Sequence, residues 1–175
     1  MKKYELTEEK KVFLGRTLYR IRALKDFELL DGTIIHAGDL GGWIEKEDNL
    51  SQEGSAWVYD NARVSGNARV FGDARVSGNA RVSGDAWVSG NAWVYDNARV
   101  YRIEHIMTFG PAGSRNGATT FYRNKNNGIS VTCGCFNGSI EDFLERVNET
   151  HGDNKHGQVY RAAAELAKLQ IDLEG

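Results

Sequence analysis

A six-residue repeat constrains this chain more than any other feature of its sequence. From Ala56 to Val100 an alanine is followed two positions later by a valine, and this Ala-x-Val unit returns every six residues, eight times in all. Residues two positions apart in an extended segment point to the same side, so both side chains of each unit face one interior. A period of six does not fit a helix or a long-stranded meander, and it predicts a solenoid that turns at every hexad.

The residues between the units indicate where the chain turns. In every gap a glycine or an aspartate is followed by asparagine or aspartate. Glycine in such a pair readily adopts a positive φ. Short strands therefore alternate with tight corners. The predicted corners are Gly66, Gly72, Gly78, Gly84 and Gly90, with Asp60 and Asp96 in the same place at the two ends of the repeat.

Read from the valine, the unit Val-Ser-Gly-Asn-Ala-Arg resembles the hexapeptide-repeat family of left-handed β-helices. The resemblance covers residues 56–100 and implies three hexads per triangular turn, so that residues 18 apart stack. It predicts a mainly β protein with a capping segment over 1–37, a short left-handed parallel β-helix over 38–102 and an α+β module over 103–175. The block from Leu18 to Tyr59 also resembles the opening of bacterial and phage members, which implies a phage or prophage origin.

Stacking every 18 residues predicts three columns of outward side chains on the solenoid. Such long side chains either cover a narrow coil or form an oligomer interface, because exposed aromatic residues are typical of interface cores. We predict a homo-oligomer, a trimer first and a dimer second, with Trp57, Arg75, Trp87 and Trp93 in its interface. The columns are Trp57, Arg75 and Trp93 on one face, Arg63, Arg81 and Arg99 on the second, and Arg69 and Trp87 on the third.

Two further expectations concern the surface of the solenoid. Ser77 follows a valine and is expected to face outward, so that Ser77→Asp is tolerated whereas Val76→Asp unfolds the chain. An anion bound by the arginine column is disfavoured, because acidic residues at the corners are expected to neutralise it. Those residues are Asp60, Asp73, Asp85 and Asp96.

The flanking segments carry separate signals. At the start, Thr7–Lys10 is compatible with a helix, whereas Leu18–Leu24 alternates like a strand. After Val100 the period stops, and strands over 103–109, 118–123 and 129–136 are predicted, the last two joined by a turn at 126–128. Ser139 begins a capping box, which predicts a helix to about residue 149, and the spacing over 158–171 predicts a second helix.

Composition excludes several classes of partner. The chain of 175 residues has a formal net charge of −2 and a pI near 6.1, so no basic field attracts nucleic acid or a membrane. No apolar run approaches the ~20 residues of a membrane span, and the N-terminus does not resemble a leader. The only cysteines are Cys133 and Cys135, which is typical of a reducing compartment. We expect a protein of the bacterial host's cytoplasm with no membrane or nucleic-acid partner.

Two kinds of chemistry are considered for this sequence. The resemblance implies an acyltransferase that uses acyl-CoA and a histidine base, yet no histidine lies within 56–100, and His36 and His105 only flank the repeat. A zinc site would have to combine Cys133 and Cys135 with His151 and His156, whose spacings are unusual for zinc. We therefore expect no catalytic residue, no metal and no cofactor.

A glycine-bounded loop, 113–117, is the best ligand candidate. Its backbone amides, its hydroxyl group and the Arg115 guanidinium suit a phosphate or carboxylate, although Arg115 paired only with Glu141 or Asp142 is the alternative. A second polar cluster precedes a predicted helix, where anions are favoured. The predicted ligand-binding residues are Ser114, Arg115, Asn116, Thr119, Thr120, Arg123, His151, Asn154 and Lys155.

These observations predict a non-enzymatic binding protein that sequesters a small anionic, nucleotide-like ligand. By analogy with phage proteins of this size, the ligand is a host immune signal and the role is anti-defence. Two alternatives stay open. One is an acyltransferase-like enzyme, and the other is a structural module that binds a host protein.

Overall fold

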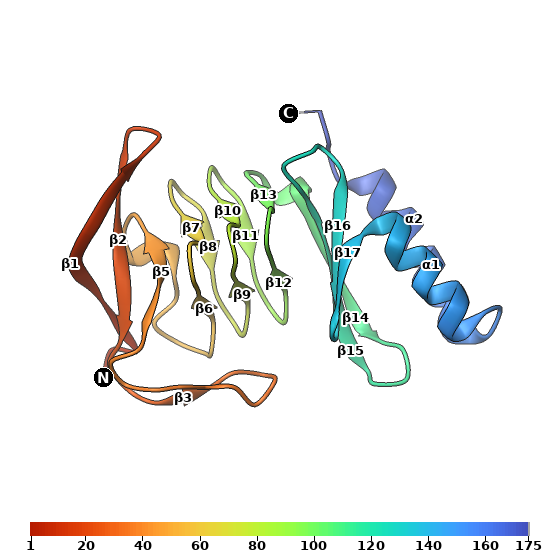
Figure 1. The fold of residues 1–175 in the computed structure, drawn as a ribbon, viewed down its shortest axis with the longest axis horizontal. Coiled ribbons are helices and arrows are strands. Elements are labelled where there is room, and N and C mark those ends of the chain that lie inside the picture. The colour runs from red at the N-terminus through yellow and green to blue at the C-terminus, as the bar shows by residue number, and fades with distance from the viewer. Residues whose placement is uncertain (175) are drawn as a thin grey trace.

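The computed structural model describes residues 1–174 and contains three parts in chain order, shown in Figure 1. An antiparallel hairpin covers one end of a parallel β-solenoid, and a module of four strands and two helices covers the other end. The predicted fold class, a mainly β protein with a hexapeptide solenoid and a C-terminal α+β module, is confirmed.

The solenoid consists of two-residue strands, one for each hexad. Neighbouring rungs are parallel and pair residues that are 18 positions apart, as Arg63 pairs with Arg81 and Arg81 with Arg99. Pairing of Ile44 with Val64 and of Leu50 with Val70 adds an incomplete turn before the regular repeat. The strands are β5 (Leu40–Ile44), β6 (Trp57–Val58), β7 (Arg63–Val64), β8 (Arg69–Val70), β9 (Arg75–Val76), β10 (Arg81–Val82), β11 (Trp87–Val88), β12 (Trp93–Val94) and β13 (Arg99–Val100).

Alanine and valine fill the interior of the coil as the repeat predicts. Every alanine and valine of the eight units is at most 1% exposed, so the coil has a continuous dry core. The predicted corners all have positive φ, from 50° at Asp60 to 72° at Gly72. The chain therefore turns where the sequence indicates, by the backbone conformation that glycine favours.

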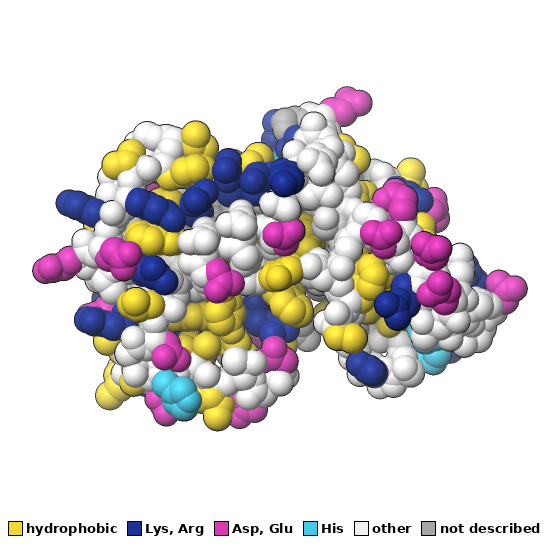
Figure 2. All heavy atoms as spheres, viewed as in Figure 1, with side chains coloured by type: hydrophobic (Ala, Val, Ile, Leu, Met, Phe, Trp, Pro, Cys, Tyr) yellow, Lys and Arg dark blue, Asp and Glu magenta, His cyan; other side chains and the backbone are white. Residues whose placement is uncertain are grey.

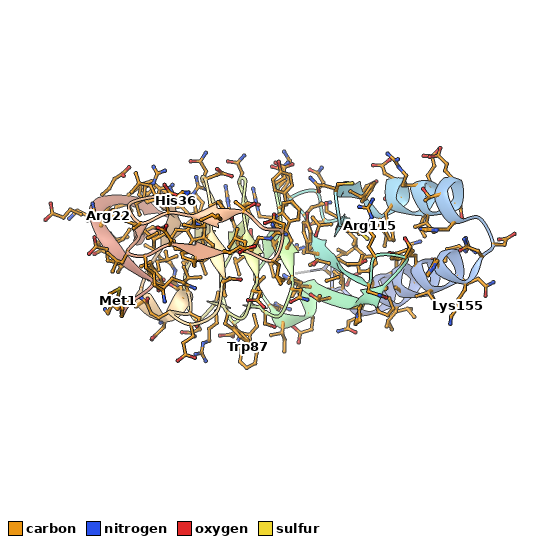
Figure 3. The ribbon with its side chains drawn as sticks, turned by 90° about the horizontal axis from the view of Figure 1, so that it is seen from below. Met1, Arg22, His36, Trp87, Arg115 and Lys155 are labelled. Carbon is orange, nitrogen blue, oxygen red and sulfur yellow. The ribbon has the colours of Figure 1, made fainter. Side chains whose placement is uncertain are left out.

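The outward columns also have the predicted composition. Trp57, Arg75 and Trp93 form one column, and Arg69 and Trp87 form another. The column on β7, β10 and β13 lies within the row of Lys and Arg side chains that crosses the solenoid in Figure 2. Trp87 projects from the coil in Figure 3.

Ser77 faces outward as expected, but it is not exposed. The residue is 6% exposed, and its Oγ accepts a hydrogen bond of 2.9 Å from the indole Nε1 of Trp93. Trp93 lies one turn further along the coil and folds its ring back over Ser77. A small outward side chain is thus buried by a large one in the next rung, which the repeat alone does not reveal.

Two strands rather than a helix form the N-terminal end. Strands β1 (Tyr4–Phe13) and β2 (Arg16–Ala23) are antiparallel, and β2 pairs with β5. Tyr4 is buried over the coil, and its hydroxyl donates to the carbonyl of Leu50 at 2.6 Å. A short hairpin of β3 (Phe27–Glu28) and β4 (Ile34–Ile35) extends along the solenoid, and a 3-10 turn spans Glu47–Asn49.

The C-terminal module closes the other end. After a 3-10 turn over Ile103–His105, strands β14 (Ile106–Ala112), β15 (Gly117–Arg123), β16 (Ile129–Cys133) and β17 (Phe136–Ser139) form an antiparallel sheet in that order. Helices α1 (Ile140–His151) and α2 (Lys155–Gln170) cover the face turned away from the coil (Figure 1). Ser139 is the N-cap of α1, as predicted.

The module is attached to the last turn by specific contacts. The amide of Trp93 donates to the hydroxyl of Thr120 at 3.0 Å, and the hydroxyl of Thr132 donates to the Trp93 carbonyl at 2.6 Å. Tyr122, 1% exposed, joins the hydrophobic core of the solenoid. Within residues 1–174 no helix has the length and apolar character needed to cross a membrane.

Candidate functional site

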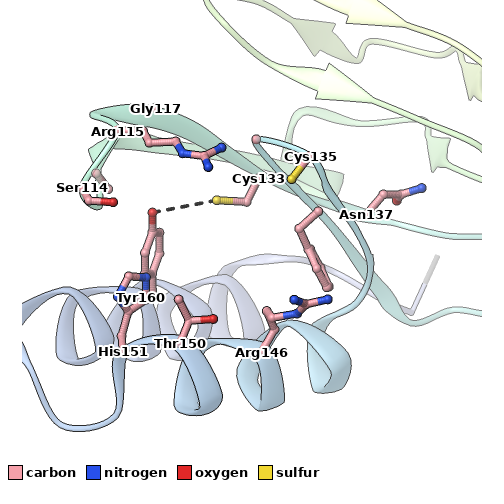
Figure 4. Close-up of a pocket in the computed structure, with 13 residues that line it drawn as sticks. Ser114, Arg115, Gly117, Cys133, Cys135, Asn137, Arg146, Thr150, His151 and Tyr160 are labelled. Atoms are coloured by element: carbon pink, nitrogen blue, oxygen red, sulfur yellow. Dashed lines mark hydrogen bonds between the residues drawn. The ribbon is translucent and has the colours of Figure 1, made fainter.

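A cavity of about 530 Å³ lies in the C-terminal module, between the β14–β15 loop, the β16–β17 turn and the two helices (Figure 4). Its volume is within the range that holds a drug-sized or nucleotide-sized molecule. None of the described residues that line it is acidic. The polar lining residues are Ser114, Arg115, Cys133, Cys135, Asn137, Arg146, Thr150, His151 and Tyr160.

Two arginines come to this cavity from opposite walls. Arg115 extends from the β14–β15 loop and Arg146 from α1 (Figure 4). In the part of the chain that the structure describes, neither guanidinium is within ion-pair distance of a carboxylate. Asp142 instead completes the cap of α1, where it accepts from the hydroxyl of Ser139 at 2.7 Å. The alternative in which Arg115 only pairs with a neighbouring acid is not observed.

A chain of hydrogen bonds forms the floor. The hydroxyl of Thr119 donates to Cys133 Sγ at 3.1 Å, and Cys133 Sγ lies 3.9 Å from the hydroxyl of Tyr160. Burial, and secondarily Cys133, raises the pKa of Tyr160 to about 12. Tyr160 is therefore a neutral phenol at physiological pH and can donate a hydrogen bond to an anion.

Gly113 allows this phenol to reach the loop. The residue has φ of +72°, and a Cβ atom placed on it would overlap the Tyr160 hydroxyl. Only glycine fits both the conformation and the close approach. The loop that carries Ser114 and Arg115 is thus positioned directly on the tyrosine of α2.

The predicted ligand residues divide between this cavity and other places. Ser114, Arg115 and His151 line the cavity, whereas Asn116 lies in the same loop with a positive φ of 48°. Thr119 is buried beneath it and acts on it only through Cys133.

Four predicted residues are corrected by the structure. Thr120 is on the opposite face of β15, where it binds the backbone of Trp93. Alternation along the strand explains this result, because neighbouring residues point to opposite faces. Arg123 donates to Asn127 Oδ1 at 2.8 Å and lies 6.0 Å from the ring of Tyr101, at the junction with the solenoid.

Asn154 and Lys155 are the other two corrections. The Asn154 side chain is the N-cap of α2 and accepts from the amide of Gly157 at 3.0 Å, so it is occupied by the helix. Lys155 is exposed at the start of α2 and does not line the cavity, and Figure 3 shows it apart from Arg115. Of the second polar cluster, only His151 therefore lines the cavity beside the 113–117 loop.

Sequence reasoning missed the contributions of α1, α2 and the β16–β17 turn. Arg146 lies on the exposed side of α1, and Tyr160 occupies a core position of α2. Cys133 and Cys135 flank Gly134, whose positive φ of 58° makes the turn that ends β16.

The side chains considered for zinc do not gather at one point. Cys133 bonds to Thr119, and the rings of His151 and His156 are 5.6 Å apart. Across residues 1–174 no three His, Cys, Asp or Glu side chains form a cluster that could hold a metal ion.

The two histidines that flank the repeat have structural surroundings. His105 is 1% exposed, and its Nδ1 accepts from the Tyr101 amide at 3.1 Å. Burial lowers its pKa below the usual value. His36 is exposed beside Asp26. His105 is thus enclosed at the end of the coil rather than facing an open groove.

Of the predicted interface tryptophans, Trp87 is the most exposed. Its side chain is 53% exposed and packs edge-on against Phe71. Trp57 is 1% exposed because Phe27 of β3 and Tyr4 cover it, so it is not available to a partner.

The rest of that column also has partners within the chain. Arg75 pairs with Asp31 of the short hairpin, and its guanidinium carbon lies 4.4 Å from the ring centroid of Trp93, a cation–π contact. The β3–β4 hairpin therefore occupies one of the three faces. The sequence does not reveal that the hairpin folds back over the face that carries Trp57 and Arg75.

Comparison with known proteins supports the solenoid. A family model described as YdcK beta solenoid repeat matches residues 56–72, 62–75 and 74–90. The chain is also 36% identical over 73 residues to an Escherichia coli (strain K12) protein described as uncharacterized acetyltransferase YdcK. That similarity covers 37% of this chain and 21% of the relative, so the chain spans about a fifth of the relative's length. Together with the parallel rungs, these matches support a hexapeptide-type β-solenoid.

Proposed function

We propose that the C-terminal module binds a small anionic, nucleotide-like ligand in the cavity beneath the β14–β15 loop. The observation that carries this proposal is a pair of guanidinium groups, Arg115 and Arg146, on opposite walls of the cavity. Among the described residues neither has a carboxylate partner, and none that lines the cavity is acidic. Guanidinium groups match phosphate and carboxylate oxygens with two parallel hydrogen bonds each.

The other lining residues suit the same ligand. Tyr160 supplies a neutral donor, and Ser114 and Thr150 supply hydroxyl groups. His151, at the C-terminal end of α1, adds an imidazole ring that can donate a hydrogen bond. A phosphate held between the two arginines would leave the rest of the roughly 530 Å³ for a sugar or base.

We infer that the biological role of this binding is sequestration of such a ligand, for example a host signal. A screen of thermal unfolding against ADP-ribose, cyclic dinucleotides and acetyl-CoA tests this directly. A ligand at a hundred times its dissociation constant stabilises the native state by about 2.7 kcal/mol. We expect a nucleotide-type probe to raise the melting temperature and to be recovered unchanged.

Matched variants locate the effect. Arg115→Ala and Arg146→Ala are each expected to weaken binding at least tenfold, with little change in folding because both residues are exposed. Arg69→Ala, an exposed arginine on the solenoid, is the control and should bind like the unaltered chain. Equal binding by Arg115→Ala and the control would remove this cavity from consideration.

Acyl transfer is a second candidate, favoured by the similarity to a relative described as an acetyltransferase. It predicts that acetyl-CoA binds along the coil and is consumed when an acceptor is present. Under this alternative Arg115→Ala leaves acetyl-CoA binding unchanged. Stabilisation by acetyl-CoA alone, with loss of free thioester, would favour this candidate over sequestration.

A further inference from the structure

The face of the solenoid formed by β7, β10 and β13 carries one arginine on each turn. Arg63, Arg81 and Arg99 are paired rung to rung, so their side chains follow one another at the ~4.8 Å spacing of neighbouring strands. Figure 2 shows the row of Lys and Arg side chains on this side of the molecule. We call these three residues the arginine column.

The column is not neutralised by acidic side chains. Within residues 1–174 none of its guanidinium groups is within ion-pair distance of a carboxylate. The expectation that the corner aspartates pair with it is therefore wrong, because these carboxylates bond at the corners themselves. Asp60 accepts from Gly78, Asp73 from Ser55, Asp85 from Asn67 and Asp96 from Asn97.

The contrast with the neighbouring column is informative. Arg75 occupies the same place in its hexad, yet it pairs with the carboxylate of Asp31. On the arginine column, burial and then the charge of Arg81 lower the pKa of Arg63 and of Arg99 below the usual value. Three like charges thus lie side by side at an electrostatic cost, which an anion would remove.

The tip of the β1–β2 hairpin and two members of the column, Arg63 and Arg81, line a groove of about 350 Å³, which Arg99 does not line. The ring of Phe13 lies 4.2 Å from the guanidinium carbon of Arg63 and 4.6 Å from that of Arg81, and it forms one wall. Ser65 and Ser83 add hydroxyl groups. The Nε atoms of both arginines are buried without a hydrogen-bond partner.

We propose that this groove binds an oligophosphate, a ligand with consecutive phosphate groups. A planar carboxylate matches a single guanidinium fork, whereas a tetrahedral phosphate has oxygens in several directions and can bridge two forks on neighbouring rungs. The groove's remaining arginine, Arg16, is already held by Glu45 at 2.9 Å, so Arg63 and Arg81 carry the binding. This site is on the solenoid, separate from the cavity of the C-terminal module.

Calorimetric titration of the full chain with inorganic tripolyphosphate at low salt tests the proposal. We expect one site per chain, with affinity at least tenfold lower in Arg63→Gln and in Arg81→Gln. Arg69→Gln is the matched control, because Arg69 has the same place in its hexad on another face. Arg81→Lys keeps the charge without the fork, and it is expected to bind at least several-fold more weakly even if the glutamine variant does not fold.

Parallel titrations identify the ligand chemistry. Tricarballylate, with three carboxylates, is expected to bind at least tenfold more weakly than tripolyphosphate. Equal affinity for tripolyphosphate and ATP assigns the site to the phosphate chain, and tighter binding of ATP assigns it to a nucleoside triphosphate. No binding of tripolyphosphate, or equal binding of tricarballylate, would overturn the proposal.

Failure here is distinguishable from failure of the proposed function. Arg115→Ala should leave the tripolyphosphate affinity unchanged, and Arg81→Gln should leave binding in the C-terminal cavity unchanged. Tripolyphosphate binding that is lost in Arg115→Ala and kept in Arg81→Gln would move the anion to the other site and refute the arginine column.

Discussion

Two glycines with the same backbone conformation provide a direct test of how the solenoid stacks. Gly84 has φ of +60° and Gly90 of +59°, and both are exposed corners. A Cβ atom on Gly90 would meet nothing within 4 Å, because no further corner lies above it. A Cβ atom on Gly84 would lie well inside van der Waals contact with the carbonyl oxygen of Tyr101. The two alanine variants therefore share the same conformational strain and differ only in space.

The structure gives the size of the difference. Left-handed strain costs about 1–2 kcal/mol, offset by about 0.4–1 kcal/mol from the stiffer unfolded chain, so Gly90→Ala should lose about 1 kcal/mol. Gly84→Ala must also displace the Tyr101 carbonyl, which accepts from the Asp85 amide at 3.3 Å. Overpacking and a weakened hydrogen bond add about 2–4 kcal/mol. Its melting temperature should therefore be roughly 5–15 °C below that of Gly90→Ala.

Urea unfolding followed by tryptophan fluorescence, and thermal unfolding followed by circular dichroism, measure both quantities. Equal unfolding free energies, within about half a kcal/mol, would refute the reasoning. In that case the corner glycines would be required for their conformation alone, and close stacking of successive turns would not limit which residue a corner accepts.

Three other outcomes are expected. Burial lowers the pKa of Lys3 from 10.5 to about 8, so between these pH values the unfolded chain binds more protons than the folded chain, and the free energy of unfolding should rise from pH 8 toward pH 10. Urea titrations at several pH values should show a smaller rise for Lys3→Met. Part of the rise should remain, because the pKa of Lys11 is also lowered to about 8. Added NaCl should raise the melting temperature of the unaltered chain more than that of Arg81→Gln, since salt screens repulsion within the arginine column; an equal salt response would contradict that repulsion. Light scattering should find that the unaltered chain is a homo-oligomer, a trimer first and a dimer second. Trp87→Arg should convert it to the 19.5 kDa monomer. A monomeric unaltered chain would exclude an oligomer interface that contains Trp87.

The repeat predicts the solenoid so completely because each hexad determines its own structure. Ala-x-Val fixes which side is buried, and the following Gly-Asn or Gly-Asp pair fixes the turn. Parallel pairing at 18 residues then follows from three hexads per turn, and it predicts the neighbours of Arg81 correctly. At every rung the hexad pattern and the packing of the turns require the same residues to be buried, so the solenoid can be predicted from the sequence.

The sequence does not reveal contacts that the six-residue repeat does not dictate. The β3–β4 hairpin covers Trp57, and the ring of Trp93 covers Ser77. In the candidate site, the glycines on either side of Arg115 in the sequence already indicate a ligand-binding loop. Arg146 and Tyr160 come from helices whose arrangement over the sheet has no sequence signature of this kind, so they were found only in three dimensions.

The three-sided coil also fixes the angle between the two ends of the molecule. The hairpin is attached to β5 at one end, and the module is attached to β12 through the backbone of Trp93 at the other. Because one hexad advances the chain by a third of a turn, inserting one hexad of six residues would rotate the module by about 120° relative to the hairpin. Adding or removing 18 residues would keep their orientation and change only their separation by ~4.8 Å. Related chains that preserve the relative orientation of both ends should therefore differ by whole turns, so that their numbers of hexads differ by multiples of three.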